Sequence, residues 1–277
     1  MRQASVEASY RRLLVTAASL AALAVASAPA HAQKTDEEIA RAALNPVAAM
    51  ISVPLQYNYD QKFGSQETGH KNYVNVQPVI PFSISKDWNL ISRTIVPLVD
   101  QQNIFPGSGS QSGIGDVTQS FFFSPKKPTE NGWIWGAGPV LLLRTASDNK
   151  LGAEKWGLGP TAVFLKQDSG WTYGALVNHI WSVGGDSSRA DISSTFLQPF
   201  LSYTTKTHTS FAVNSESTYN WKTHDWAVPI NMSVKQLTKV GDQRLQLEAG
   251  VRYWADSNLG GPHGWGARLT VTFLFPE

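Results

Sequence analysis

Apolar and polar residues alternate along much of the chain, and the last stretch shows the pattern most simply. In RLTVTFLFPE (residues 268–277), Leu269, Val271, Phe273 and Phe275 fall on one face of an extended chain. A period of two predicts a β-strand with one apolar face. In a soluble sandwich that face would meet a second sheet, whereas in a membrane barrel it would meet lipid.

Similar alternating stretches precede this one, and turn residues end each of them. Their apolar positions fall at residues 51–59, 74–82, 90–98, 117–123, 133–143, 156–164, 171–177, 197–203, 211–221, 226–234 and 245–253. Such strands exceed the usual five or six residues of globular sheets and suit a tilted crossing of a bilayer. With the last stretch we count about twelve, an even number as in bacterial single-chain barrels. The pattern predicts an all-β fold, an antiparallel up-and-down transmembrane β-barrel over residues 50–277.

The connections alternate in length. Tight links occur at residues 85–87, 167–170 and 206–207, and longer loops rich in Gly, Ser and Asn occur at 100–113, 147–154, 184–191 and 256–264. Membrane barrels have short turns on the periplasmic side and longer loops outside. Two links depart from this rule, because 124–132 is longer and 222–224 is shorter than it predicts.

Tryptophan supports the membrane alternative. The chain has 10 Trp, and most lie near predicted strand ends. The expected periplasmic rim has Trp88, Trp133, Trp135 and Trp171, and the other rim has Trp156, Trp181, Trp221, Trp226 and Trp265. An indole joins an apolar body to a polar N–H, which favours the bilayer interface. Core packing in a sandwich would more often place aromatics in the middle of strands, so we interpret these residues as two lipid-facing belts.

The N-terminal segment predicts export. A basic region is followed by an apolar stretch at residues 13–26 and by AHA at residues 30–32, which fits an A-x-A cleavage site. The apolar stretch is shorter than the roughly 20 residues of a membrane-spanning helix. We therefore predict a signal peptide at residues 1–32, cleaved after Ala32, and localisation in the cell outer membrane.

Composition narrows the function classes. The signal segment carries three Arg and one Glu, which accounts for the whole net charge of +2, so the mature chain is near neutral. The net charge of the mature chain therefore gives no support to nucleic-acid binding. Charged residues make up 16% of the chain, below the roughly 25% of soluble domains, which indicates that much of the surface does not face water. The chain has no Cys, so no disulfide stabilises it.

Residues 33–49 do not alternate and predict a short helix before the first strand. Thr35 followed by Glu38 fits a capping box, and Asn45 with Pro46 would end the helix. We favour a solvated periplasmic segment for this helix. The alternative places it in or under the lumen as a plug.

Five segments resemble a family of bacterial outer-membrane transporters linked with the meta pathway of phenol degradation, in particular the subset often mislabelled neuromedin U. They are NPVAAMISVPLQYNYD, NVQPVIPFSISKDWNLISRTIVP, GIGDVTQSFFFSPKKPT, GWIWGAGPV and FLQPFLSYTTKT. The resemblance covers nearly all of the mature chain and includes Gly115-Asp116 and Ser124-Pro125 as landmarks. It implies an outer-membrane barrel proposed to pass small molecules, aromatic ones among them, and it supplies no catalytic residues.

If the apolar faces look outward, the opposite faces form the lumen and hold nearly all in-strand charges. Lipid exposure requires this, because Arg or Lys at the bilayer midplane costs about 2–4 kcal/mol. The candidate lumen and selectivity residues are Arg93, Asp116, Arg144, Glu216, Lys235, Glu248, Arg252 and Arg268. They either line a conduit, whose slight basic excess would favour anions, or form ion pairs that brace a filled barrel. Arg252 should lie near Arg268, with Glu216, Glu248 or a passing anion between them.

We therefore predict a channel for small solutes, aromatic or anionic, that is not an enzyme and needs no cofactor or metal. Its partners would be the outer-membrane bilayer, the solutes and the barrel assembly machinery, which would recognise the C-terminal strand. Barrels commonly finish on the aromatic residue itself, whereas Pro276 and Glu277 follow Phe275 here.

A lipid hydrolase and a structural or adhesive barrel remain as alternatives. A hydrolase would need a Ser/His pair on the outward face, and His179 is expected opposite Thr195, with Ser193 on the diagonal. No hydroxyl lies two residues from His179 on its own strand, and NHIW is not a nucleophile motif. A histidine within an interfacial belt of tryptophans is the ordinary explanation.

Overall fold

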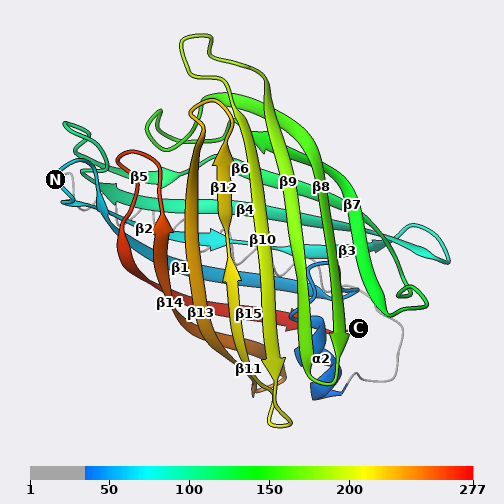
Figure 1. Cartoon of the computed structure of the whole chain (residues 1–277). Coiled ribbons are helices and arrows are strands. Elements are labelled where there is room, and N and C mark those ends of the chain that lie inside the picture. The colour runs from blue at the N-terminus through cyan, green and yellow to red at the C-terminus, as the bar shows by residue number, and fades with distance from the viewer. Residues whose placement is uncertain (1–34, 277) are drawn as a thin grey trace. The chain divides into compact units, whose positions relative to one another are not determined.

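The computed structural model describes residues 35–276, which form a closed antiparallel β-barrel with one short helix (Figure 1). The strands are β1 (Ile51–Phe63), β2 (Gly69–Val76), β3 (Val79–Ser83), β4 (Trp88–Gln102), β5 (Ser110–Ile114), β6 (Val117–Pro125), β7 (Trp133–Leu143), β8 (Lys155–Asp168), β9 (Trp171–Gly185), β10 (Ser193–Thr204), β11 (Thr209–Ser215), β12 (Ser217–Asn220), β13 (Asp225–Val240), β14 (Gln243–Asp256) and β15 (Gly264–Phe275). β15 pairs with β1, which closes the barrel. The expected signal peptide lies outside the described residues.

The fifteen strands make twelve crossings from one end of the barrel to the other. Three of these crossings, β2/β3, β5/β6 and β11/β12, are each divided into two strands by one interruption. Proline accounts for two of the interruptions. Pro78 lies between β2 and β3 and has no N–H for the ladder. Between β11 and β12, the Glu216 N–H donates to the Pro229 carbonyl at 3.3 Å, and the proline cannot donate in return. The predicted number of crossings is confirmed.

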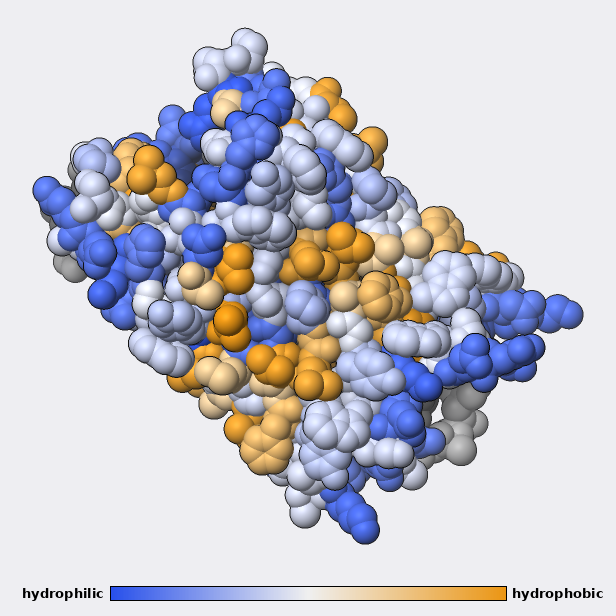
Figure 2. All heavy atoms as spheres, in the orientation of Figure 1, coloured by the Kyte–Doolittle hydropathy of each residue, from blue (hydrophilic) through white to orange (hydrophobic). Residues whose placement is uncertain are grey.

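The register confirms the predicted faces. Leu55 of β1 lies opposite Val271 of β15, and Asn58 lies opposite Arg268. The first pair is exposed on the outside, whereas the second is buried inside the barrel. Figure 2 shows apolar residues gathered in a band across the middle of the visible wall, with hydrophilic residues towards both ends. This outer surface suits a barrel that spans a membrane.

The two aromatic belts are present. All nine tryptophans assigned to them are exposed, by between 36% and 54%. On one rim the rings of Trp88 and Trp135 meet edge to face, 5.7 Å apart. On the other rim the rings of Tyr253 and Trp265 lie 4.9 Å apart. The tenth tryptophan, Trp254, is not among the exposed residues and belongs to the interior.

The connections differ between the two ends of the barrel, as predicted. One end, which we call the short-turn end, has tight links such as Ser169-Gly170, where both residues adopt positive φ. The other end, the long-loop end, has loops at residues 103–109, 144–154, 186–192 and 257–263. The loop expected at 100–113 is shorter than predicted, because β4 and β5 extend beyond the apolar band. No helix within residues 35–276 is long and apolar enough to cross a bilayer.

The helix α2 (Asp36–Ala42) has the predicted capping box. The Glu38 N–H donates to the Thr35 hydroxyl at 3.3 Å, and the Thr35 N–H donates to the Glu38 carboxylate at 2.8 Å. Our preference for a solvated segment is wrong, because Ile39 is fully buried and packs with Leu237 and Leu274 inside the short-turn end. The helix therefore lies inside this end of the barrel, where the alternative placed it.

Cysteine substitutions on β13 test the faces. Met232 and Val234 are 44% and 45% exposed on the outside, whereas Ser233 between them is 9% exposed and faces inward. We expect Met232→Cys and Val234→Cys to react with a lipid-soluble maleimide, and Ser233→Cys to be protected from it. The chain has no other cysteine to interfere. Equal labelling at all three positions would mean that the register is shifted by one residue.

Candidate functional site

A buried ion-pair network, centred on Glu216, crosses the interior of the barrel. Its carboxylate accepts two hydrogen bonds from Arg268, at 2.9 and 2.7 Å, and one from Arg252 at 2.7 Å. Both arginine side chains are only 2% exposed. A carboxylate held between two arginines in this way forms strong charge-assisted hydrogen bonds.

The other guanidinium nitrogens of the two arginines also donate hydrogen bonds. Arg252 donates from Nε to Asn231 at 2.8 Å, and from Nη1 to Asp60 at 3.2 Å and to the Tyr73 hydroxyl. The other Asp60 oxygen accepts from the Trp254 indole at 2.9 Å, and the Arg252 guanidinium lies 5.7 Å from that ring.

Arg268 completes the network by donating from Nε to Asn58 at 2.8 Å. Of the three groups expected between Arg252 and Arg268, the structure thus places Glu216 there. The bracing arrangement holds for this pair, since every guanidinium nitrogen of Arg252 and Arg268 donates to a protein oxygen.

Two further predicted residues form a second pair. The Lys235 ammonium lies 3.6 Å from the Glu248 carboxylate, and both side chains face inward. Arg93 also faces inward from β4, but it donates to the Gln77 amide oxygen at 3.0 Å and not to a carboxylate. Gln77 in turn donates to Gln56 at 3.2 Å.

Asp116 and Arg144 are not in-strand lumen charges, which corrects our expectation. Asp116 lies between β5 and β6, and its carboxylate accepts from the backbone N–H groups of Thr145, Ala146 and Ala153. It therefore anchors the loop between β7 and β8. Arg144 lies just beyond β7, is exposed, and pairs with Glu154 at 3.3 Å. Strand parity alone could not show that both strands end before these residues.

The long-loop end is held in place by further polar contacts. The carboxylate of Glu154 also lies 3.7 Å from Arg189, which joins two loops. Lys155 donates to Asp191 at 3.0 Å, and Ser182 donates to it at 3.1 Å. These hydrogen bonds hold the pKa of Asp191 below its ordinary value.

A cavity of about 190 Å³ remains inside the barrel. It lies between the segment that follows α2, residues 42–50, and the inner wall formed by strands on two sides of the barrel. Its polar lining includes Arg93, Lys235, Gln198 and Asn214. Two charged side chains, Arg93 and Lys235, thus adjoin unoccupied space in this cavity.

An apolar cluster fills another sector of the interior. Val47 of the N-terminal segment packs there with inward-facing residues of β3, β4, β6, β8 and β9. These residues are Val79, Ile91, Phe122, Val163, Leu165 and Leu176. The segment thus covers an apolar wall on one side and borders the polar cavity on the other.

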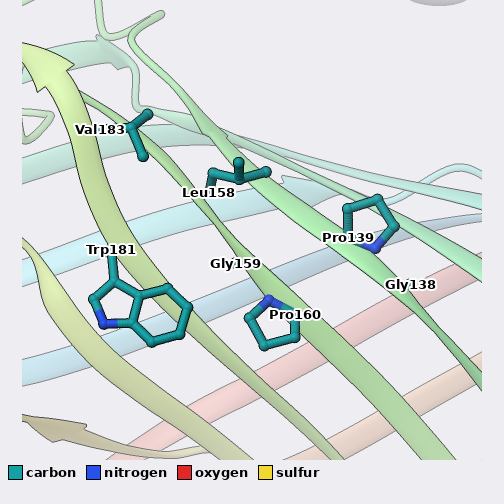
Figure 3. Close-up of a pocket in the computed structure, with 7 residues that line it drawn as sticks. All are labelled: Gly138, Pro139, Leu158, Gly159, Pro160, Trp181 and Val183. Atoms are coloured by element: carbon teal, nitrogen blue, oxygen red, sulfur yellow. The ribbon is translucent and has the colours of Figure 1, made fainter.

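A larger pocket of about 480 Å³ lies on the outside of the wall, between β7, β8 and β9 (Figure 3). Pro139 and Pro160 pair across the strands there, and neither can donate to the ladder. Gly159 permits close approach, because a Cβ at this position would meet the His179 carbonyl oxygen at 1.7 Å. The lining is almost wholly apolar and faces outward, so the pocket suits lipid chains better than a polar solute.

His179 lies near this pocket on the outward face, opposite Thr195 as expected. Its Nδ1 is 2.7 Å from the Thr195 hydroxyl, which also accepts from the Trp221 indole at 2.8 Å. The Ser193 hydroxyl is 3.4 Å from Nε2, and the Trp181 ring lies 4.1 Å away. The histidine is therefore in contact with the aromatic belt, and among residues 35–276 its hydrogen-bond partners are the hydroxyls of Thr195 and Ser193. Residues 35–276 hold no cluster of side chains suited to a metal.

Sequence reasoning missed three members of the network, namely Asp60, Tyr73 and Trp254. Strand parity places all three inward, so the signal was present. Trp254 was left out of both belts, and the structure shows that its indole N–H is used by a buried carboxylate.

Comparison with known proteins gave matches at the level of structure. No family model and no curated protein matches the chain. The COG4313 outer membrane channel from Pseudomonas putida F1 is similar, with a TM-score of 0.65 and 17% identity over 90% of this chain and 100% of that one. The NanC porin has a TM-score of 0.50 and 10% identity over 81% of this chain and 98% of that one.

These likenesses show a shared fold. They agree with the outer-membrane channel part of the resemblance noted from the sequence, but the link with phenol degradation is not confirmed. In fold, the chain is similar to these two outer-membrane barrels.

Removing one charge tests the network. Glu216→Gln leaves Arg252 and Arg268 without their shared carboxylate, and breaking a buried pair costs about 3–5 kcal/mol. We expect the free energy of unfolding in urea, followed by tryptophan fluorescence in detergent, to fall by about this amount. Glu67→Gln is the control, because its ion pair with Lys62 is exposed and should contribute about 1 kcal/mol or less. Equal losses in the two variants would contradict a central role for Glu216.

Proposed function

We propose that this protein is an outer-membrane channel for small solutes, closed in its resting state by the N-terminal segment. The observation that carries the proposal is the internal cavity lined by Arg93 and Lys235 and bordered by residues 42–50. A barrel with a purely structural role has no need of charged side chains beside open space in its interior. The likeness in fold to an outer-membrane channel supports the same function.

The outer-membrane location is part of the proposal. The apolar outer band and the aromatic belts support a bilayer as the surroundings. The predicted signal peptide supports export, and β15, which carries the alternating C-terminal stretch, is the segment that we expect the assembly machinery to recognise.

The basic residues of the cavity favour anionic solutes over cations. Arg252 and Arg268 are occupied by Glu216. Arg93 and Lys235 are the cationic side chains that line the cavity, and Lys235 lies 3.6 Å from Glu248. Passage of aromatic solutes is an extension of this proposal, supported by the resemblance noted from the sequence.

The contacts of α2 suit a displaceable plug. Asp36 pairs with Arg244 of β14, and Gln167, at the end of β8, donates to the Arg41 carbonyl at 2.8 Å. β14 and β8 lie almost opposite each other around the barrel, so the helix bridges its mouth. The buried apolar residues of the helix itself are Ile39 and Ala40, whereas Val47 and Met50 of the following segment are also buried. Release of α2 alone therefore exposes less apolar surface than release of the whole segment.

Planar-bilayer recording of the refolded mature protein tests the function. We expect brief unit currents from the native protein, because its lumen is closed most of the time. A barrel that never conducts and releases fatty acid from phospholipid would instead support a hydrolase built on His179 and Ser193.

Weakening the plug should increase conduction. Ile39→Asn places an amide in the apolar contact of α2 with the wall, so we expect a severalfold rise in the fraction of time spent open. Glu37→Gln is the matched control, since Glu37 is exposed on the same helix. If the two variants conduct alike, the helix is not the gate.

A further inference from the structure

Arg93 differs from the other arginines that face the interior. Within residues 35–276, Arg244, Arg252 and Arg268 each lie within 4.0 Å of a carboxylate, and Arg93 does not. Its one hydrogen bond goes from Nη2 to Gln77 at 3.0 Å. Arg93 lies opposite Val79 on one neighbouring strand and opposite Ser120 on the other. Neither of these cross-strand partners carries a negative charge.

The charged groups around Arg93 leave it with a positive excess. Glu216 is close enough to interact electrostatically, but Arg252 and Arg268 already share its oxygens. Lys235 lines the same cavity, and its carboxylate partner Glu248 is 3.6 Å away. An ionised group inside a membrane protein is costly without a counter-charge and indicates a functional site.

The cavity also supplies the other features of a small binding site. The Asn214 amide oxygen accepts from Asn231 at 2.9 Å, which leaves the Asn214 N–H groups to donate to a ligand. Met50, Val79 and Phe200 provide an apolar wall. At about 30 Å³ per water molecule, the 190 Å³ volume corresponds to about six waters, which admits only a small molecule.

We propose that this cavity binds a small monocarboxylate with a short apolar chain. The carboxylate accepts hydrogen bonds from the Arg93 guanidinium, which presents a planar fork that matches its geometry. Lys235 adds positive charge, and the chain of the ligand packs against Phe200 and Val79. This site rests on the proposed channel function and adds to it the class of solute that binds in the lumen.

Calorimetric titration of the full mature protein in detergent tests the site with two probes of equal size, butyrate and n-butylammonium. The native protein should bind butyrate at least tenfold more tightly than butylammonium. Arg93→Gln should weaken butyrate binding at least tenfold, and Arg93→Lys should recover part of the loss because it restores the charge. Arg189→Gln, at the long-loop end, is the matched control and should bind like the native protein.

A heat-dependent gel shift verifies that each variant is a folded barrel. The site is overturned if the native protein binds both probes equally or binds neither, a result that does not depend on any variant folding. It is also overturned if folded Arg93→Gln binds butyrate as the native protein does. Unit currents without butyrate binding would reject the site and keep the channel, whereas butyrate binding without currents would reject the channel.

Discussion

Hydrocarbon offers no partner to an unpaired backbone N–H or C=O, and this constraint underlies the rest of the structure. The chain meets it by pairing its first strand with its last, from Ile51 opposite Phe275 to Tyr59 opposite Ala267. Once β1 and β15 close the ladder, the wall has two faces with opposite requirements. The outside has to be apolar, so the interior is where strand charges can be placed at low cost.

The interior meets its own requirement in two ways. Several interior charges are paired, as Glu216 shows by joining two arginines from different strands. An apolar sector is filled by inward-facing residues and by Val47 of the N-terminal segment. A polar conduit and a braced barrel were alternatives for the sequence, and the structure shows ion-pair bracing with a cavity beside it. The braced part lies around Glu216, and the open part lies between Arg93 and Lys235.

Outward-facing polar residues obey the same constraint. Gln119 accepts from Thr94 at 2.5 Å and donates to Ser92 at 3.0 Å, so the three side chains satisfy one another on the lipid face. His179 contacts Thr195 in a similar way, close to the aromatic belt. The polar side chains on this face are therefore satisfied by hydrogen bonds to one another.

The sequence by itself determined the barrel, its crossings and the face of each strand, because side-chain direction alternates with a fixed period and lipid exposure excludes charge from one parity. It also determined the capping box at Thr35, which depends on residues three apart. For the same reason, the sequence predicted correctly which charged side chains face the interior. They are Arg93, Glu216, Lys235, Glu248, Arg252 and Arg268.

Only the tertiary structure decided which charges meet. Glu216 and Arg268 are separated by 52 positions in the chain, and their contact depends on strand stagger and barrel curvature, which no local pattern encodes. The same holds for Asp60 and Trp254, and for the burial of Ile39 against Leu274. A seven-residue helix has the same local signals in solvent as in a lumen, so its position depends on the apolar surface that the distant strands leave uncovered.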